Sequence, residues 1–101
     1  MATVSKTLFR GAATTNTATV LYTVPSATNT VVTNIIVTNT AGSSGTFTLG
    51  LGSTNLATTV TVGANDSTVI DLKQVLTATQ TITGGASANT VNFHIGGVEI
   101  S

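Results

Sequence analysis

Residues 30–39, TVVTNIIVTN, constrain the fold more than any other part of this chain. Most of them are β-branched, and such side chains lose rotamer freedom in a helix but pack well on a strand. The strand period gives two faces. The face expected to lie in the core consists of Val31, Thr33, Ile35 and Val37. The opposite face consists of Val32, Asn34, Ile36 and Thr38. Because two aliphatic side chains on this second face would otherwise lie in water, we expect a central strand whose back is covered by a neighbouring chain or arm.

Short alternating segments recur along the rest of the chain, separated by turn-forming residues about every ten positions. We expect strands at residues 7–10, 19–24, 30–39, 46–51, 58–62, 68–72, 80–83 and 90–100. Pro25 ends the second of these because it lacks a backbone donor, and the connection after it predicts a hairpin with residues 30–39. With no long helix, this pattern predicts an all-β fold, an antiparallel β-sandwich of seven to eight short strands, either jelly-roll or immunoglobulin-like.

A chain of 101 residues makes one domain. We expect residues 1–17 to form an N-terminal arm or edge strand and residues 18–101 to form the sandwich. One short helical turn is predicted at residues 71–76, because Leu72, Val75 and Leu76 recur at helical spacing and Asp71 can cap them.

The last predicted strand changes parity along its length. Val91, Phe93 and Ile95 share one face, whereas Val98 and Ile100 have the opposite parity. An extra residue accommodated at Gly96-Gly97 would return the last two to the core face. The sequence therefore predicts a β-bulge at these glycines.

The chain is nearly uncharged, since charged residues make up only 6% of it and its formal net charge is zero. Nucleic acid is not an expected partner, because phosphate binding needs clustered Lys and Arg. No apolar run is long enough to span a bilayer, so a membrane is not expected either. The first residues lack the pattern of a secretory signal, which favours synthesis in a cytoplasm. A surface of Thr, Ser and Asn instead suits permanent contact with neighbouring molecules.

Catalytic and ligand-binding motifs are not found in the sequence. His94 is the only histidine, the acids are Asp66, Asp71 and Glu99, and there is no cysteine. A small hydrolase would need His94 and a carboxylate within hydrogen-bond reach of a serine, and the nucleophile motif G-x-S-x-G does not occur. We therefore assign no catalytic residue, metal or cofactor, and expect a protein that is not an enzyme.

Residues 21–51, LYTVPSATNTVVTNIIVTNTAGSSGTFTLGL, together with TVIDLKQVL and VNFHIGGVEIS, resemble small β-sandwich virion structural proteins of tailed bacteriophages. The resemblance implies a capsid decoration or cement protein, made in the host cytoplasm, that binds the outside of the assembled shell and stabilises it. Its partners would be the major capsid protein and its own copies, and a trimer would suit the local three-fold positions of an icosahedral lattice. The alternative is a tail, neck or fibre-associated module that contacts host surface glycans.

Two groups of residues are the expected partner contacts under this hypothesis. The N-terminal group would contact the capsid protein by strand addition or apolar anchoring. It consists of Lys6, Leu8, Phe9 and Arg10. The second group lies on the outer face predicted for residues 30–39 and would contact other copies of the chain. It consists of Val32, Asn34 and Ile36.

Overall fold

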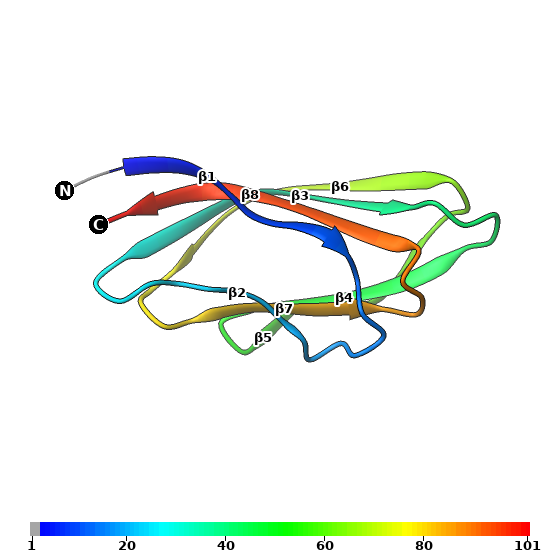
Figure 1. The fold of residues 1–101 in the computed structure, drawn as a ribbon, viewed down its shortest axis with the longest axis horizontal. Coiled ribbons are helices and arrows are strands. Elements are labelled where there is room, and N and C mark those ends of the chain that lie inside the picture. The colour runs from blue at the N-terminus through cyan, green and yellow to red at the C-terminus, as the bar shows by residue number, and fades with distance from the viewer. Residues whose placement is uncertain (1–2) are drawn as a thin grey trace.

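Eight β-strands form two antiparallel four-stranded sheets in the computed structural model, which describes residues 3–101 (Figure 1). The strands are β1 (Thr3–Ala12), β2 (Val20–Thr23), β3 (Asn29–Asn39), β4 (Gly45–Leu51), β5 (Thr54–Val62), β6 (Asp66–Leu76), β7 (Thr81–Ala86) and β8 (Val91–Ile100). Sheet A has the order β1-β8-β3-β6 and sheet B the order β2-β7-β4-β5. The predicted all-β antiparallel sandwich is confirmed.

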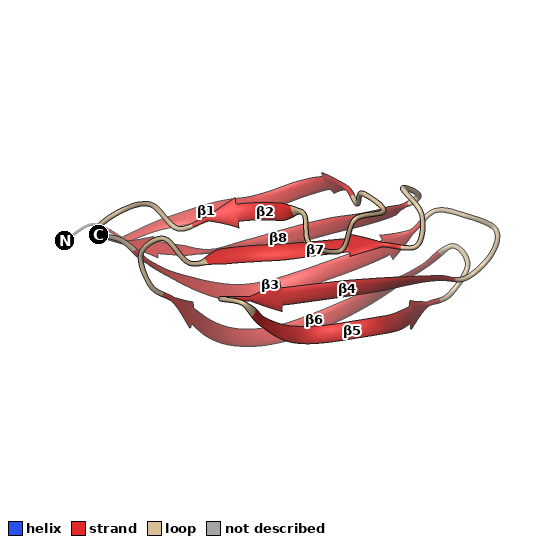
Figure 2. Cartoon of the chain, turned by 90° about the horizontal axis from the view of Figure 1, so that it is seen from below, coloured by secondary structure: helices blue, strands red, loops and turns tan. Residues whose placement is uncertain are grey.

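The order of the strands is that of a jelly roll. Among residues 3–101, β4 and β5 are the only strands consecutive in the chain that pair with each other. A two-residue turn joins them at Gly52 and Ser53, whose φ angles are positive, 57° and 69°. Every other connection within residues 3–101 passes from one sheet to the other. The strands of the two layers run in nearly the same direction (Figure 2), as in an aligned sandwich.

The hairpin predicted between residues 19–24 and 30–39 is wrong. The strand β2 pairs with β7 in sheet B, whereas β3 pairs with β8 and β6 in sheet A. Val24 and Thr28 are both buried in the connection between β2 and β3. The segment around Pro25 therefore crosses the end of the sandwich and does not turn back within one sheet.

The core lies between the two sheets and takes side chains from both. The Phe47 and Phe93 rings, one from each sheet, meet edge to face with centroids 6.3 Å apart. Both rings are fully buried, and each contributes about 1.5–3 kcal/mol through the apolar surface it removes from water. Aliphatic side chains that are also fully buried surround them. These are Ile35, Leu49, Ile82, Ile95, Val24, Val32, Val37, Val62 and Val91.

The strand β3 lies inside sheet A, as predicted, but its faces exchange partway along. The register with β8 shifts at Thr33, so Val32 pairs with Gly97 and Asn34 with Gly96. Before this bulge the inward residues have even numbers, and after it they have odd numbers. The prediction is therefore right for Ile35 and Val37 but wrong for the residues before the bulge: Val32 is buried, whereas Val31 is half-buried and Thr33 is exposed.

The prediction of a bulge at Gly96-Gly97 is wrong about the strand, because the bulges lie in the two neighbouring strands. The strand β8 keeps its alternation, and the extra residues are Leu8 in β1 and Thr33 in β3, on either side of the glycines. A Cβ atom at Gly97 would lie 2.4 Å from the Val31 carbonyl oxygen, so only glycine fits there. Glu99 therefore shares a side with Ile95, while Val98 and Ile100 are half-buried on the outer side of sheet A.

The helical turn predicted at residues 71–76 is also wrong, because residues 3–101 contain no helix and β6 runs through this segment. Leu76 is buried and Leu72 packs against the core, whereas Val75 is 61% exposed on the opposite side. The three apolar residues thus divide between the two faces of a strand paired with β3. Tertiary pairing outweighs a single turn of helical spacing, which is too short to be stable alone.

Candidate functional site

The outer face of sheet A, which points away from sheet B, presents residues in rows across the four strands. The valine row consists of Val75, Val31 and Val98, which are paired directly across β6, β3 and β8. Another row consists of Val69, Ile36, His94 and Arg10, and a third, between these two, of Asp71, Asn34, Gly96 and Thr7. Paired side chains on one face lie about 4.5–5.5 Å apart. The face is therefore a continuous surface of aliphatic and uncharged polar groups.

Two of these valines are among the most exposed apolar side chains of the chain. Val69 is 62% exposed and Val75 is 61% exposed. Val31, Val98 and Ile36 are half-buried beside them. Clustered exposed aliphatic groups on one sheet face are typical of a contact surface.

A shallow depression of about 270 Å³ opens on the outer face of sheet A around Gly96. We call it the Gly96 depression; its outer-face lining consists of Thr7, Arg10, Asn34, Ile36, Thr38, His94 and Gly96. A Cβ atom at Gly96 would lie 2.6 Å from the Asn34 side-chain oxygen. The absence of a side chain at this position therefore leaves room for the Asn34 amide and creates the depression.

The charges on the outer face of sheet A lie at its opposite sides. Arg10 is on the edge strand β1, whereas Asp71 and Lys73 are two residues apart on the edge strand β6, and all three are exposed. Three strand spacings, about 14 Å, separate β1 from β6. In the part of the chain that the structure describes, none of the three forms an ion pair. The guanidinium at one side of the face and the carboxylate at the other are thus both available to another molecule.

Six of the seven predicted contact residues fall into two sets. Arg10, Asn34 and Ile36 meet at the Gly96 depression. Leu8 and Val32 are buried in the core, and Phe9 packs against it. Val32 is therefore not on the outer face to which the sequence assigned it, because the bulge at Thr33 reverses the preceding residues.

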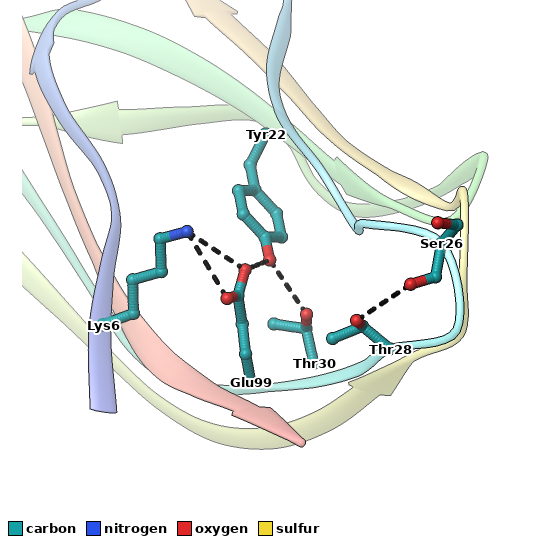
Figure 3. A network of polar contacts seen from close by, with 6 residues as sticks. All are labelled: Lys6, Tyr22, Ser26, Thr28, Thr30 and Glu99. Atoms are coloured by element: carbon teal, nitrogen blue, oxygen red, sulfur yellow. Dashed lines mark hydrogen bonds and ion pairs between the residues drawn. The ribbon is translucent and has the colours of Figure 1, made fainter. Parts of the chain in front are cut away.

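Lys6, the remaining predicted contact, belongs to a polar cluster near the chain termini (Figure 3). Its Nζ donates to Glu99 Oε2 at 3.3 Å. The Tyr22 hydroxyl donates to the same oxygen of the Glu99 carboxylate and lies 3.0 Å from Thr30 Oγ1. We call these four residues the Glu99 clasp. It joins β1, β3 and β8 of sheet A to β2 of sheet B.

The electrostatics of the Glu99 clasp follow from these contacts. The Tyr22 hydroxyl, and then Lys6, lower the pKa of Glu99 below its ordinary value, against the opposing effect of burial. Burial, and then the Glu99 carboxylate, raise the pKa of Tyr22. The sequence alone did not indicate a partner for Glu99. Its position could have indicated that it points inward, because it lies an even number of residues after Phe93 and Ile95 and therefore on the same side of β8. The cluster therefore ties the two sheets together.

A constellation for catalysis or metal binding is not found among residues 3–101. His94 lies between Arg10 and Ile36 on the outer face, and no hydrogen bond joins it to a serine or a carboxylate there. The same residues hold no group of three or more His, Cys, Asp or Glu side chains that could bind a metal ion. They also include no helix long and apolar enough to cross a membrane.

The edge strand β1 offers a second kind of contact. It pairs with β8 on one side and, within residues 3–101, with no strand on the other. Residues 3–7, before the bulge at Leu8, are all exposed. An unpaired edge with exposed residues can accept a strand from another chain.

Comparison with known proteins does not place this chain in a family. No protein-family model matches it, and neither a curated protein nor a solved structure is significantly similar to it.

Proposed function

We propose that the protein is a virion structural protein of the capsid decoration or cement type, without enzymatic activity. It binds the outside of the assembled shell through the free edge of β1 and contacts its own copies through the outer face of sheet A. The observation that carries this proposal is the outer face itself, where exposed valines, threonines and asparagines cover four strands. The few charges stand at its two sides, Arg10 on β1 and Asp71 and Lys73 on β6.

Such a surface is suited to permanent association. Burying its valines removes apolar area from water at about 25 cal/mol per Å². The short polar side chains around them lose little conformational entropy when a neighbour packs on them. With a net charge of zero, the copies do not repel one another when they crowd on a lattice.

The stabilising action follows from mass action. A protein that binds only the assembled, expanded shell stabilises that state by its binding free energy, and the effect is repeated at every site. No reaction is needed. Jelly rolls occur in viral capsid domains and lectins, so this fold accommodates the role, although the proposal rests on the surface and not on the fold.

The experiment is cosedimentation with undecorated, expanded capsids of a tailed phage. We expect the wild-type protein to pellet with the shells and to raise their melting temperature. The variant Val4→Lys places a charge on the edge strand β1, where the native side chain is 51% exposed, and should weaken binding at least about tenfold.

The matched control is Val20→Lys, at a 55% exposed valine on β2, an edge strand of sheet B, and it should bind normally. Failure of the wild-type protein to bind any capsid form would contradict the proposal. Equal loss by both variants would exclude β1 as the attachment edge.

A glycan-binding module of the tail or fibre is the second candidate, and the Gly96 depression is the observation that favours it. Hydroxyl, amide and guanidinium groups surround the aliphatic side chain of Ile36 there, a combination that can hold a sugar ring. A glycan array probed with and without calcium tests this candidate. Binding that disappears in Asn34→Ala would support it over the capsid role.

A further inference from the structure

Arg10 and Asp71, at opposite sides of the outer face of sheet A, become complementary when a second copy is placed against it. Lys73 is two residues from Asp71 on β6, on the side away from the row of Arg10. Arg10 and Asp71 lie on opposite edge strands, β1 and β6, and on neighbouring rows of the face. A two-fold axis parallel to the strands exchanges the two sides of the sheet. It therefore places β1 of one copy over β6 of the other, and β8 over β3.

We propose that two copies associate face to face through the outer face of sheet A, with Asp71 of each copy in the Gly96 depression of the other, against Arg10. This inference deepens the contact between copies in the proposed function and rests on it for its biological role. It commits to a homodimer with a two-fold axis, and so differs from the trimer expected from lattice geometry.

The register of sheet A supports this arrangement. Under the two-fold axis the row that contains Asp71 lies opposite Thr7, which lines the Gly96 depression. Arg10 is on the next row, about 7 Å further along the strand, which is within the reach of an arginine side chain across a face-to-face contact. The carboxylate thus meets a guanidinium that forms no ion pair among residues 3–101.

The same rotation matches the apolar groups. In the valine row, Val31 of each copy lies opposite Val98 of the partner subunit, because β3 and β8 exchange places. Ile36 lies opposite His94 of the partner subunit for the same reason. The middle of the contact therefore combines aliphatic side chains with Asn34 and His94, and Arg10, Asp71 and Lys73 lie on the outer strands, as in an interface with a charged rim.

The available area is that of a reversible dimer. Four strands at their usual spacing are about 19 Å wide, and ten paired residues are about 33 Å long, which gives about 600 Å² per copy. The two copies together bury about 1,200 Å², at the lower limit of specific interfaces. We therefore expect a dimer that dissociates on dilution.

Sedimentation equilibrium over a range of concentrations tests the proposal. The wild-type protein should form dimers reversibly. Each dimer contains two Arg10–Asp71 pairs, so Arg10→Glu or Asp71→Arg should raise the dissociation constant at least about tenfold. The double variant Arg10→Glu/Asp71→Arg restores the pairs with exchanged charges and should return the constant to within about threefold of wild type.

An apolar control separates this face from general surface effects. Val75→Asp, at a 61% exposed valine of the valine row, should weaken the dimer, whereas Val20→Asp on sheet B should not. Arg10, Asp71, Val75 and Val20 are all exposed, so the variants should melt within a few degrees of wild type when compared as dilute monomers. If a variant melts at a much lower temperature, its dissociation constant is measured at a temperature where the variant is still folded.

Several results would overturn the dimer: a monomer at every concentration, a trimer, or a double variant no stronger than the single ones. A monomeric protein that still cosediments with capsids would overturn this inference and leave the proposed binding to the capsid intact. A dimer with the predicted charge exchange that binds no capsid would do the reverse.

Discussion

Asn39 is the buried polar residue on which the far end of the sandwich depends, and replacing it should be costly. Its side chain is 1% exposed. Its Nδ2 donates to the Ser43 carbonyl at 2.8 Å, and its Oδ1 accepts from the Ala41 backbone N–H at 3.0 Å. Weaker contacts reach the carbonyls of Val62 and Gly63 at 3.4 and 3.3 Å. One amide thus joins the β3–β4 loop to the end of β5 and the loop that follows it.

The expected cost of Asn39→Ala follows from these bonds. Each of the two short bonds contributes about 1 kcal/mol, and leaving their buried partners unsatisfied adds about 1–2 kcal/mol. The free energy of unfolding should fall by about 3 kcal/mol, a large part of the about 5–15 kcal/mol typical of a small domain. The melting temperature should fall by about 10–25 °C.

The variant Asn39→Asp should be worse than Asn39→Ala. It keeps the size of the side chain and its acceptor oxygen, but it places a carboxylate against the carbonyl oxygens of Ser43, Val62 and Gly63. A buried charge without a donor costs more than a lost hydrogen bond.

Urea unfolding followed by far-UV circular dichroism measures these differences. Asn29→Ala is the matched control, because Asn29 begins the same strand but is exposed, and it should change stability by less than about 0.5 kcal/mol. If Asn39→Ala unfolds within about 0.5 kcal/mol of wild type, or Asn39→Asp is the more stable of the two, the hydrogen-bond argument is wrong.

Two further substitutions test the packing at the bulges and the polar cluster near the termini. Gly97→Ala should lower the free energy of unfolding by about 2–3 kcal/mol, because the new Cβ would lie 2.4 Å from the Val31 carbonyl oxygen. The control Gly42→Ala should be nearly neutral, because a Cβ there has nothing within 4 Å. Equal melting temperatures of the two variants would contradict this reasoning. Because the folded-state pKa of Glu99 lies below its ordinary value of 4.5, the Glu99 clasp stabilises the fold above that pH and is lost as pH falls through the lowered pKa. Glu99→Gln should therefore be less stable than wild type near pH 7 and should show a smaller loss of stability on acidification, both read from urea midpoints; parallel pH profiles for the two proteins would show that Glu99 does not contribute.

The sequence by itself determined where most of the strands lie, although not at residues 71–76, where a helical turn was predicted. Residues 30–39, 46–51 and 90–100 were predicted and observed in nearly the same places, because β-branched side chains, alternation and turn residues act within a few positions of one another. The placement of Phe93 and Ile95 on the core face was correct for the same reason, because β8 keeps its alternation.

Only the tertiary structure decided which strands pair and where the bulges lie. The jelly-roll order joins β1 to β8, and β3 to both β8 and β6. These strands are far apart in the chain, and the sequence within each strand does not indicate its partner. The bulges at Leu8 and Thr33 depend on that pairing, and a shift of one residue sends every following side chain to the other face.

The candidate site was predictable in its residue types but not in its arrangement. Arg10, Asn34 and Ile36 were expected contacts, and they share the Gly96 depression only because β1, β8 and β3 are neighbours in that order. Val32 is not among them, because the bulge at Thr33 points its side chain into the core. Local chemistry fixes what a strand is, whereas long-range hydrogen bonding between strands fixes which of its side chains another molecule can reach.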